Sequence, residues 1–495
     1  MTALNRRHLL LGATGIAGAG LLSACTSPSN KPGTPAPGSG ASRSYPTPSL
    51  APAPGRSVVQ QTLAPRPVTL DLGGLTAKTW AYDDSSMGVL RGTAGDLFRI
   101  TVDNQLPAST SVHWHGVRLH HAADGVPGVT QDPIEPGTSF TYEFVAPDPG
   151  TFFFHPHSGV QLDRALYAPL IIDDPDEPGA YDDEWIVVLD DWTDGVGRGP
   201  DEIFEEFAAE NGAVSMGMGH GNMRDMGHGA SSPLGDAGDV EYPHYLINGR
   251  VPEAPATFEA MPGQRIRIRI INAASDTIFK LALGGHTMTV THSDGFPVEP
   301  VDTAALYIAM GERYDVTVTL RDGTFPLAAR PEGKTGTARA VVRTASGDAP
   351  STDAPVPELD GDALLGTQLR AAAQARLPDG EPDDTFDVEL NGQMDPYGWG
   401  INGRKFGDHE PLEVSPDRRV RMRMTNMTMM AHPMHIHGHT WGLPGSGGLR
   451  KDTVLLTPMQ TIELDLITDN PGEWMLHCHN IYHAEVGMMT TMRYA

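Results

Sequence analysis

The sequence predicts an all-β chain folded as three Greek-key β-sandwiches. One observation is a strand-like segment, residues 95–104, in which apolar side chains alternate with polar ones before a closing Asn. Similar segments follow at residues 263–272 and 417–426, and such a repeat indicates a repeated structural unit. The other observation is that short runs bounded by Pro-Gly turns recur, whereas helical periodicity is scarce. Alternation of this kind suits antiparallel sheets with one face toward water.

Composition restricts the classes of protein and partner. The 495 residues, at about 100–200 residues per domain, leave room for about three domains. A net charge of -27 disfavours binding to nucleic acid or to an anionic lipid surface, so we expect no nucleic-acid partner. The two cysteines, Cys25 and Cys478, allow neither a disulfide framework nor a thiolate-rich zinc site. Composition does not indicate an oligomeric state.

Residues 1–24 have the pattern of an export signal. Arg6 and Arg7 precede a run of small and apolar residues that ends directly before Cys25. This pattern resembles a twin-arginine signal followed by a lipoprotein cleavage box, and the apolar run of about 17 residues is short for a membrane span. We therefore expect lipid on Cys25 to anchor the chain on the outer face of the cytoplasmic membrane, in the periplasm or cell envelope.

A tether and three domains are predicted to follow. Residues 25–57 are rich in Pro, Ser, Gly and Thr and cannot bury enough apolar surface to offset their ordering entropy, so we expect a flexible tether. The repeat then predicts domains at residues 58–175, 176–350 and 351–495, the last of which begins with a linker.

Four His-X-His pairs occupy matched places in the first and third repeats, 322 residues apart. They are His113 and His115, His155 and His157, His435 and His437, and His477 and His479. Residues i and i+2 of a strand point to one face, so each pair presents two imidazoles side by side. A single such pair is often a surface or packed pair, but four in register predict a cluster of copper, zinc or iron between two domains. The middle repeat has no matching pair and is expected to supply no ligand.

Cys478 indicates a second kind of site. It lies between His477 and His479, so its side chain points away from the cluster and into the core of the third domain. His432 precedes the third pair, while His483 and Met488 follow Cys478 by five and ten residues. Two imidazoles, a thiolate and a weak axial thioether are the ligands of a blue, electron-transferring copper. A buried cysteine that packs as a small hydrophobe would not account for these partners.

Together these segments resemble the four copper-binding motifs of the multicopper oxidases, over about residue 58 to the end. The resemblance implies cupredoxin-like domains, four copper ions, and electrons that pass from Cys478 through His477 and His479 to dioxygen, which is reduced to water. It implies a type 1 copper at His432, Cys478, His483 and Met488, a type 2 copper at His113 and His435, and type 3 coppers at His115, His155 and His479 and at His157, His437 and His477.

Two acidic residues are candidates for proton supply. Asp124 lies eleven residues after His113, where members of the family place a carboxylate near the cluster. It could instead cap the turn formed with Gly125. Relatives often carry a second acid directly after the last type 1 histidine, but that position is Ala484 here. Glu485 follows it and is the remaining candidate.

Methionine-rich segments point to the reductant. Residues 215–229 contain Met216, Met218, His220, Met223, Met226 and His228 among glycines, and thioethers are soft ligands suited to Cu(I). The alternative is a low-complexity insert in which methionines happen to cluster. A second group, Met427, Met429 and Met430, precedes His432 and is also a candidate for binding Cu(I). Met422 and Met424 follow strand alternation and are expected in the core.

The resemblance extends to exported bacterial cuprous oxidases of copper tolerance. The first hypothesis is therefore a detoxifying oxidase that converts Cu(I) to Cu(II) with dioxygen as acceptor. A second hypothesis is a laccase-like oxidase of phenols or aromatic amines, which needs an open pocket beside His432 and His483. A third is a non-catalytic copper-binding envelope protein, although relatives of that kind should lack cluster ligands that this chain retains.

Overall fold

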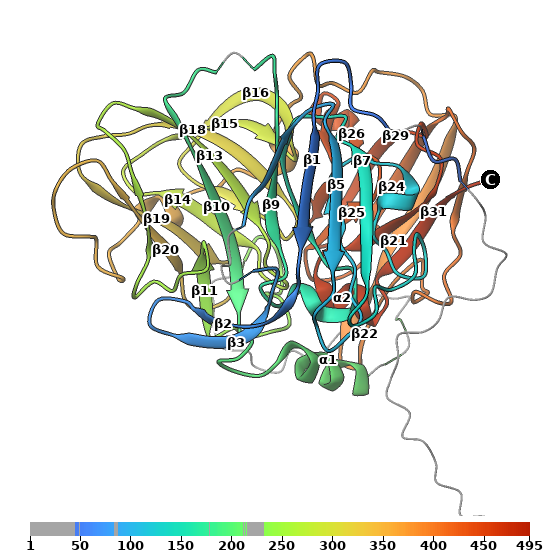
Figure 1. Cartoon of the computed structure of the whole chain (residues 1–495), viewed down its shortest axis with the longest axis horizontal. Coiled ribbons are helices and arrows are strands. Elements are labelled where there is room, and N and C mark those ends of the chain that lie inside the picture. Colours follow the sequence, from blue (N-terminus) through green and yellow to red (C-terminus); the bar gives the residue numbers. More distant parts are fainter. Residues whose placement is uncertain are drawn as a thin grey trace, which may run out of the picture. The chain divides into compact units, whose positions relative to one another are not determined.

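The computed structural model of the chain describes residues 45–48, 50–83, 88–177, 179–210, 212, 214 and 232–495. The predicted export signal, Cys25 and the methionine-rich segment 215–229 lie outside the described residues. Strands hold 45% of the chain and helices 8%, which confirms the predicted all-β class of packed sheets (Figure 1). No helix among the described residues is both long enough and apolar enough to span a membrane.

The strands fall into three groups along the chain. In the first group one sheet has the order β1 (Val58–Leu63), β5 (Leu97–Asp103), β7 (Ser139–Val145). A second sheet has the order β4 (Leu90–Thr93), β9 (Ala168–Asp173), β8 (Gly150–His155), β6 (His113–His115), and a separate hairpin is made by β2 (Arg66–Asp71) and β3 (Thr76–Ala81).

The middle group, residues 183–343, has two larger sheets. One has the order β11 (His244–Ile247), β10 (Asp183–Trp192), β13 (Arg265–Asn272), β18 (Arg313–Thr319), β15 (Met288–Ser293), β16 (Phe296–Thr303). The other has the order β12 (Ala256–Glu259), β20 (Ala338–Arg343), β19 (Thr324–Pro331), β14 (Phe279–Leu283), β17 (Leu306–Ile308).

The third group, residues 384–494, repeats that arrangement. One sheet has the order β22 (Tyr397–Ile401), β21 (Asp384–Met394), β24 (Arg419–Asn426), β29 (Thr461–Ile467), β26 (Trp441–Leu443), β27 (Leu449–Lys451). The other has the order β23 (Leu412–Val414), β31 (Met489–Tyr494), β30 (Glu473–Cys478), β25 (His432–Ile436), β28 (Thr453–Leu456). The helices are α1 (Pro200–Ala209) and α2 (Ile481–Val486), with short 3-10 turns at His121–Ala123, Gly159–Leu162, Pro357–Asp360, Gly366–Gln368 and Pro444–Ser446.

The repeated sequence segments become equivalent strands, β5, β13 and β24. Each pairs antiparallel with one neighbour, as the alternation predicts, and parallel with the first strand of its group, so the sheets are mixed. In β13 the face expected to be wet is buried, because Arg267 and Arg269 form ion pairs there with Asp315. Arg269 also donates a hydrogen bond to Thr151 of β8, so this charged face of the middle group packs against the first group.

The tether expected over residues 25–57 does not stay free of the body to its end. The ring of Tyr45 lies 4.8 Å from the ring of His121, measured between centroids. Ala53 N donates to Gly95 O over 2.8 Å, and Arg56 N donates to Ala53 O over 2.9 Å. These contacts stabilise the end of the tether and offset the entropy lost when it is ordered. Composition alone did not indicate them.

Candidate metal centre

Neighbouring strands carry the His-X-His pairs. His113 on β6 lies opposite His155 on β8, and His435 on β25 lies opposite His477 on β30. Because side chains alternate across a strand, the pair histidines on one ladder point to one face. His157, His437 and His479 lie one or two residues beyond the ends of β8, β25 and β30. The two faces meet: the rings of His113 and His437 stack with centroids 3.7 Å apart. The structure therefore brings all eight pair histidines together.

Three sets of these imidazoles could each hold one metal ion. In each set the candidate ligand atoms lie within 4.8 Å of one another, and the sets are His113, His115 and His435; His115, His155 and His479; and His157, His437 and His477. Ligands from the first and third groups are mixed in every set. A metal ion bound there would consequently link the two groups.

The hydrogen bonds of the rings determine which nitrogen is free. His113 Nδ1 donates to Asp124 O over 2.9 Å, His435 Nδ1 to Asp452 O over 2.9 Å, and His477 Nδ1 to Cys478 O over 2.8 Å. Carbonyl oxygens only accept, so each Nδ1 is the donor, and in a neutral ring Nε2 then carries a lone pair. Yet His435 Nε2 lies 3.5 Å from His113 Nε2, and His437 Nε2 lies 3.1 Å from His477 Nε2.

Such facing lone pairs repel one another unless a cation lies between them. Within the described part of the chain, five further ring nitrogens of the pair histidines are buried without a hydrogen-bond partner: His115 Nδ1, His155 Nε2, His157 Nε2, His479 Nδ1 and His479 Nε2. Burial, together with the neighbouring imidazoles, lowers the pKa of His115 well below its usual range and that of His477 to about 3. Neutral imidazoles are the form that binds metals, so the residues fit copper.

A separate buried group surrounds Cys478. Its Sγ lies 3.7 Å from Nδ1 of His432 and 3.7 Å from Nδ1 of His483. Asn480 caps α2 by accepting from Tyr482 N and His483 N, which places His483 in the first turn. Met488 is buried, and its main chain bonds to both Cys478 N and His483 O. A thiolate with two imidazoles is a donor set suited to copper.

The outer nitrogens of these two histidines also have partners. Thr428 Oγ1 lies 2.8 Å from His432 Nε2, and Asp239 Oδ2 lies 2.8 Å from His483 Nε2. Although burial lowers the pKa of His483, the Asp239 carboxylate raises it to about 10. Partners on the far nitrogen orient a ligating imidazole. The sequence contained no motif that would have identified Asp239.

Asp124 lies beside the cluster histidines. Its Oδ2 is 2.9 Å from His437 Nδ1, and its Oδ1 is 3.3 Å from His113 Nδ1. The carboxylate thus faces two cluster rings, whereas the turn at this residue is closed by the main-chain bond from Asp124 N to His121 O. This position is compatible with the predicted role in proton supply, which stays a prediction.

Glu485 lies on α2, and its side chain is partly buried. Burial raises the pKa of its carboxyl to about 7 from an ordinary value of 4.5. Because the folded protein disfavours the charged form, this residue contributes most stability below about pH 4.5 and loses that contribution as the pH rises through about 7. Among the described residues, we find no contact between Glu485 and the cluster histidines.

We therefore expect Glu485→Gln to stabilise the metal-free protein in a pH-dependent way. The difference in melting temperature between variant and wild type should be small near pH 4 and increase in favour of the variant up to about pH 8. Thermal unfolding of both proteins across that range, followed by circular dichroism, measures this difference. A difference that stays constant with pH would show that Glu485 titrates normally.

The methionines before His432 are separated by the fold. Met422 and Met424 are buried in the core, as predicted. Met430, grouped with the candidates for binding Cu(I), is also buried in the core, two residues before β25 begins. Met429 is 58% exposed and Met427 is partly buried. Of this group, Met429 offers the most accessible thioether.

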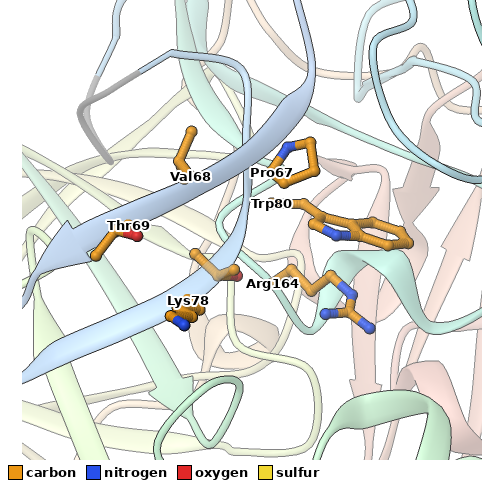
Figure 2. Close-up of a pocket in the computed structure, with 7 residues that line it drawn as sticks. Pro67, Val68, Thr69, Lys78, Trp80 and Arg164 are labelled. Carbon is orange, nitrogen blue, oxygen red and sulfur yellow. The ribbon is translucent and has the colours of Figure 1, made fainter. Parts of the chain in front are cut away.

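A surface cavity of about 370 Å³ beside the β2 and β3 hairpin has a different character (Figure 2). Its lining contains no histidine, cysteine or carboxylate; the residues are Pro67, Val68, Thr69, Lys78, Thr79, Trp80 and Arg164. The Arg164 guanidinium lies 4.2 Å from the centre of the Trp80 ring and is paired with Asp194. This cavity is not the metal centre.

Residues from the middle group support the cluster, although the sequence indicated no role for that group. Among the described residues it supplies no member of the three imidazole sets. Yet Arg313 of β18 donates to both carboxylate oxygens of Asp452, over 2.6 Å each. Asp452 Oδ1 in turn lies 3.3 Å from His115 Nε2. Sequence reasoning missed both residues, since neither belongs to a histidine motif.

Known proteins resemble this chain in sequence and fold. Three sequence models described as multicopper oxidase match residues 66–177, 220–347 and 380–495. The chain is 47% identical to multicopper oxidase MmcO of Mycobacterium tuberculosis over 89% of this chain and 88% of that protein. It is 29% identical to a copper resistance protein A homolog of Pseudomonas syringae pv. tomato, over 82% and 87% of the two chains.

A solved laccase from Botrytis aclada shares the fold, with a TM-score of 0.71, 24% identity and 88% of each chain covered. The histidine and cysteine sets described above lie within two of the matched regions, residues 66–177 and 380–495. The chain therefore belongs to the multicopper oxidases, a family of copper-binding oxidoreductases that use dioxygen.

Proposed function

We propose that this multicopper oxidase oxidises Cu(I) to Cu(II) outside the cytoplasmic membrane, to which lipid on Cys25 would anchor it. In the balanced reaction four Cu(I), one dioxygen and four protons give four Cu(II) and two waters. Bound copper would supply the one-electron redox chemistry. The copper resistance protein among the relatives supports this direction.

We assign four resident coppers to the buried donor sets. His432, Cys478, His483 and Met488 would hold type 1 copper, and His113 and His435 would hold type 2 copper. The remaining six histidines would hold the type 3 pair, as His115, His155 and His479 and as His157, His437 and His477. The short distances between the candidate atoms in each histidine set, and between Cys478 and both His432 and His483, support this assignment.

Asp239 is the observation that carries the choice of Cu(I). Its carboxylate lies 2.8 Å from His483 Nε2 and accepts a hydrogen bond from Tyr397. Three residues earlier in the chain, Asp236 is exposed, and its N donates to Met429 O over 3.0 Å. The exposed thioether of Met429 therefore lies on a segment hydrogen-bonded to the one that contains Asp236 and Asp239. The second segment contacts His483 through Asp239.

This chemistry suits a small soft cation. Thioethers bind Cu(I), and carboxylates attract positive charge. The segment also follows directly after residues 215–229, whose methionines and histidines are the other candidates for binding Cu(I). Asp239 would hold positive charge at the His483 edge, and Asp124 would hold a proton at Oδ2 beside His437.

Burial of the two histidines disfavours the alternative reductants. The side chain of His432 is 0% exposed and that of His483 is 1% exposed. A phenol or aromatic amine could not contact either ring in this conformation, so a laccase-like activity would require the site to open. A protein that only binds copper, without catalysis, would not need the complete histidine cluster that this chain retains.

The test compares Cu(I) with hydroquinone as reductant for Asp239→Asn. We expect kcat/KM for Cu(I) to fall about tenfold or more, which corresponds to about 1.4 kcal/mol, because the amide cannot attract the cation. Oxidation of hydroquinone should fall less. Oxygen uptake in copper-loaded protein measures both rates. Tyr397→Phe is the matched control, since it removes a bond to Asp239 but keeps its charge.

Deletion of residues 215–229 tests the contribution of the methionine-rich segment separately. Cuprous oxidation should fall more than phenol oxidation. Equal losses for the two reductants in this variant would contradict a role for the segment, and equal losses in Asp239→Asn would contradict Cu(I) as the preferred reductant.

A further inference from the structure

The middle group of strands touches the histidine cluster with its main chain. Gly311, in the turn between β17 and β18, adopts a φ of +81°. A Cβ placed there would lie 2.9 Å from both His115 Cε1 and His479 Cδ2. These two rings belong to the first and third groups, so the glycine permits one turn of the middle group to lie against both.

Arg313, two residues later, bonds to all three groups. Its side chain is 0% exposed. Its two terminal nitrogens donate to Asp452 Oδ1 and Oδ2 of the third group over 2.6 Å each. Nε donates to Thr151 O on β8 of the first group over 3.1 Å, and Nη1 also donates to Gly311 O over 3.0 Å.

Asp452 carries the effect of Arg313 to the imidazoles. Its main-chain O accepts from His435 Nδ1 over 2.9 Å. Its Oδ1 lies 3.3 Å from His115 Nε2 and accepts from Thr453 Oγ1 over 2.9 Å. Gly116, directly after His115, leaves the space for this pair, because a Cβ there would overlap both Arg313 and Asp452.

A second buried ion cluster holds the same loop. Lys451, which precedes Asp452, has its Nζ 3.0 Å from Asp294 Oδ2 and 3.1 Å from Glu312 Oε1. Both carboxylates belong to the middle group, and Glu312 lies between Gly311 and Arg313. Two buried cations therefore bind this part of the third group to the middle group. Arg313 of the middle group pairs with Asp452, and Lys451 of the third group pairs with Asp294 and Glu312.

We propose that Arg313 is a positioning residue that sets the geometry of His115 and His435, so that the ligand-free middle group controls the metal cluster. The two rings come from different groups, and they stack with centroids 3.8 Å apart. A bidentate guanidinium and carboxylate pair fixes orientation as well as distance, which a single point charge does not. Partners that orient metal-binding histidines influence metal affinity strongly. The proposal rests on the copper assignment given under the proposed function.

The experiment compares Arg313→Gln and Arg313→Lys with wild type after loading with copper. Copper per chain is counted by mass spectrometry, a chelator competition gives the affinity, and electron paramagnetic resonance separates type 1 from type 2 signals. For Arg313→Gln we expect about 10–100-fold weaker binding at the type 2 position, with the type 1 signal unchanged. Arg313→Lys should keep its copper but show an altered type 2 spectrum, because lysine cannot make the bidentate pair.

Arg267→Gln is the matched control. Arg267 is another buried arginine of the middle group, but its partners are Asp315 and Glu177, which are not part of the cluster. Type 2 copper should stay bound in this variant. Equal loss in Arg267→Gln and Arg313→Gln, or a wild-type type 2 spectrum in both Arg313 variants, would overturn the proposal.

If Arg313→Gln does not fold, the spectrum of Arg313→Lys decides the question by itself. An unchanged spectrum there would refute the positioning role. A wild-type protein without any type 2 signal would instead refute the copper assignment, and loss of preference for Cu(I) in Asp239→Asn would concern only the reductant.

Discussion

Cys478→Ser is expected to remove the blue colour of the copper-loaded protein and nearly all of its oxidase activity. The cysteine Sγ lies 3.7 Å from each of two imidazole nitrogens, and a thiolate is the soft, strongly donating member of that set. A serine hydroxyl stays protonated and is a harder donor. We expect turnover with Cu(I) or hydroquinone to fall more than about a thousandfold, or about 4 kcal/mol in activation free energy.

Copper content and spectroscopy distinguish this result from unfolding. The variant should bind one copper fewer than wild type and keep a type 2 signal, because the imidazole cluster is built from other side chains. Cys478 is buried in the core, but serine is of similar size, so the fold should persist. A variant that stays blue, or one that loses all copper, would contradict the assignment.

Asp124→Asn is expected to lower turnover by about 10²–10⁴-fold, the usual contribution of a general acid or base. The carboxylate lies 2.9 Å from His437 Nδ1, and an amide oxygen can still accept that hydrogen bond. The amide cannot carry a proton. Binding of copper should therefore survive while oxygen reduction slows. Oxygen uptake at saturating Cu(I), together with copper per chain, measures the two effects separately.

Asp124→Glu is the conservative comparison for this residue. It retains an acid and should recover part of the activity lost in the amide variant. Turnover of Asp124→Asn equal to that of wild type would show that proton supply does not pass through this carboxylate. Loss of copper from the amide variant would indicate that Asp124 acts only by orienting His437.

Local patterns in the sequence were sufficient to predict the fold class and to nominate the candidate donor residues. Strand alternation alone places His113 and His115 on one face and Cys478 on the face opposite its neighbours. The repeat then indicated which pairs are equivalent. Neither pattern indicated that Met430 is buried in the core or that Tyr45 packs on His121, because such packing depends on residues distant in the chain.

The sequence by itself determined that eight imidazoles and one thiol are presented from four strands and the residues directly after them, since a period of two residues is a local property of extended chain. The tertiary structure decided which ring nitrogens stay free, and that Asp239, Asp452 and Arg313 support the rings. Arg313 and Asp452 are 139 residues apart, and no local period relates them. Their contact exists only where the sheets of different groups pack together, so the geometry of the metal centre depends on that packing.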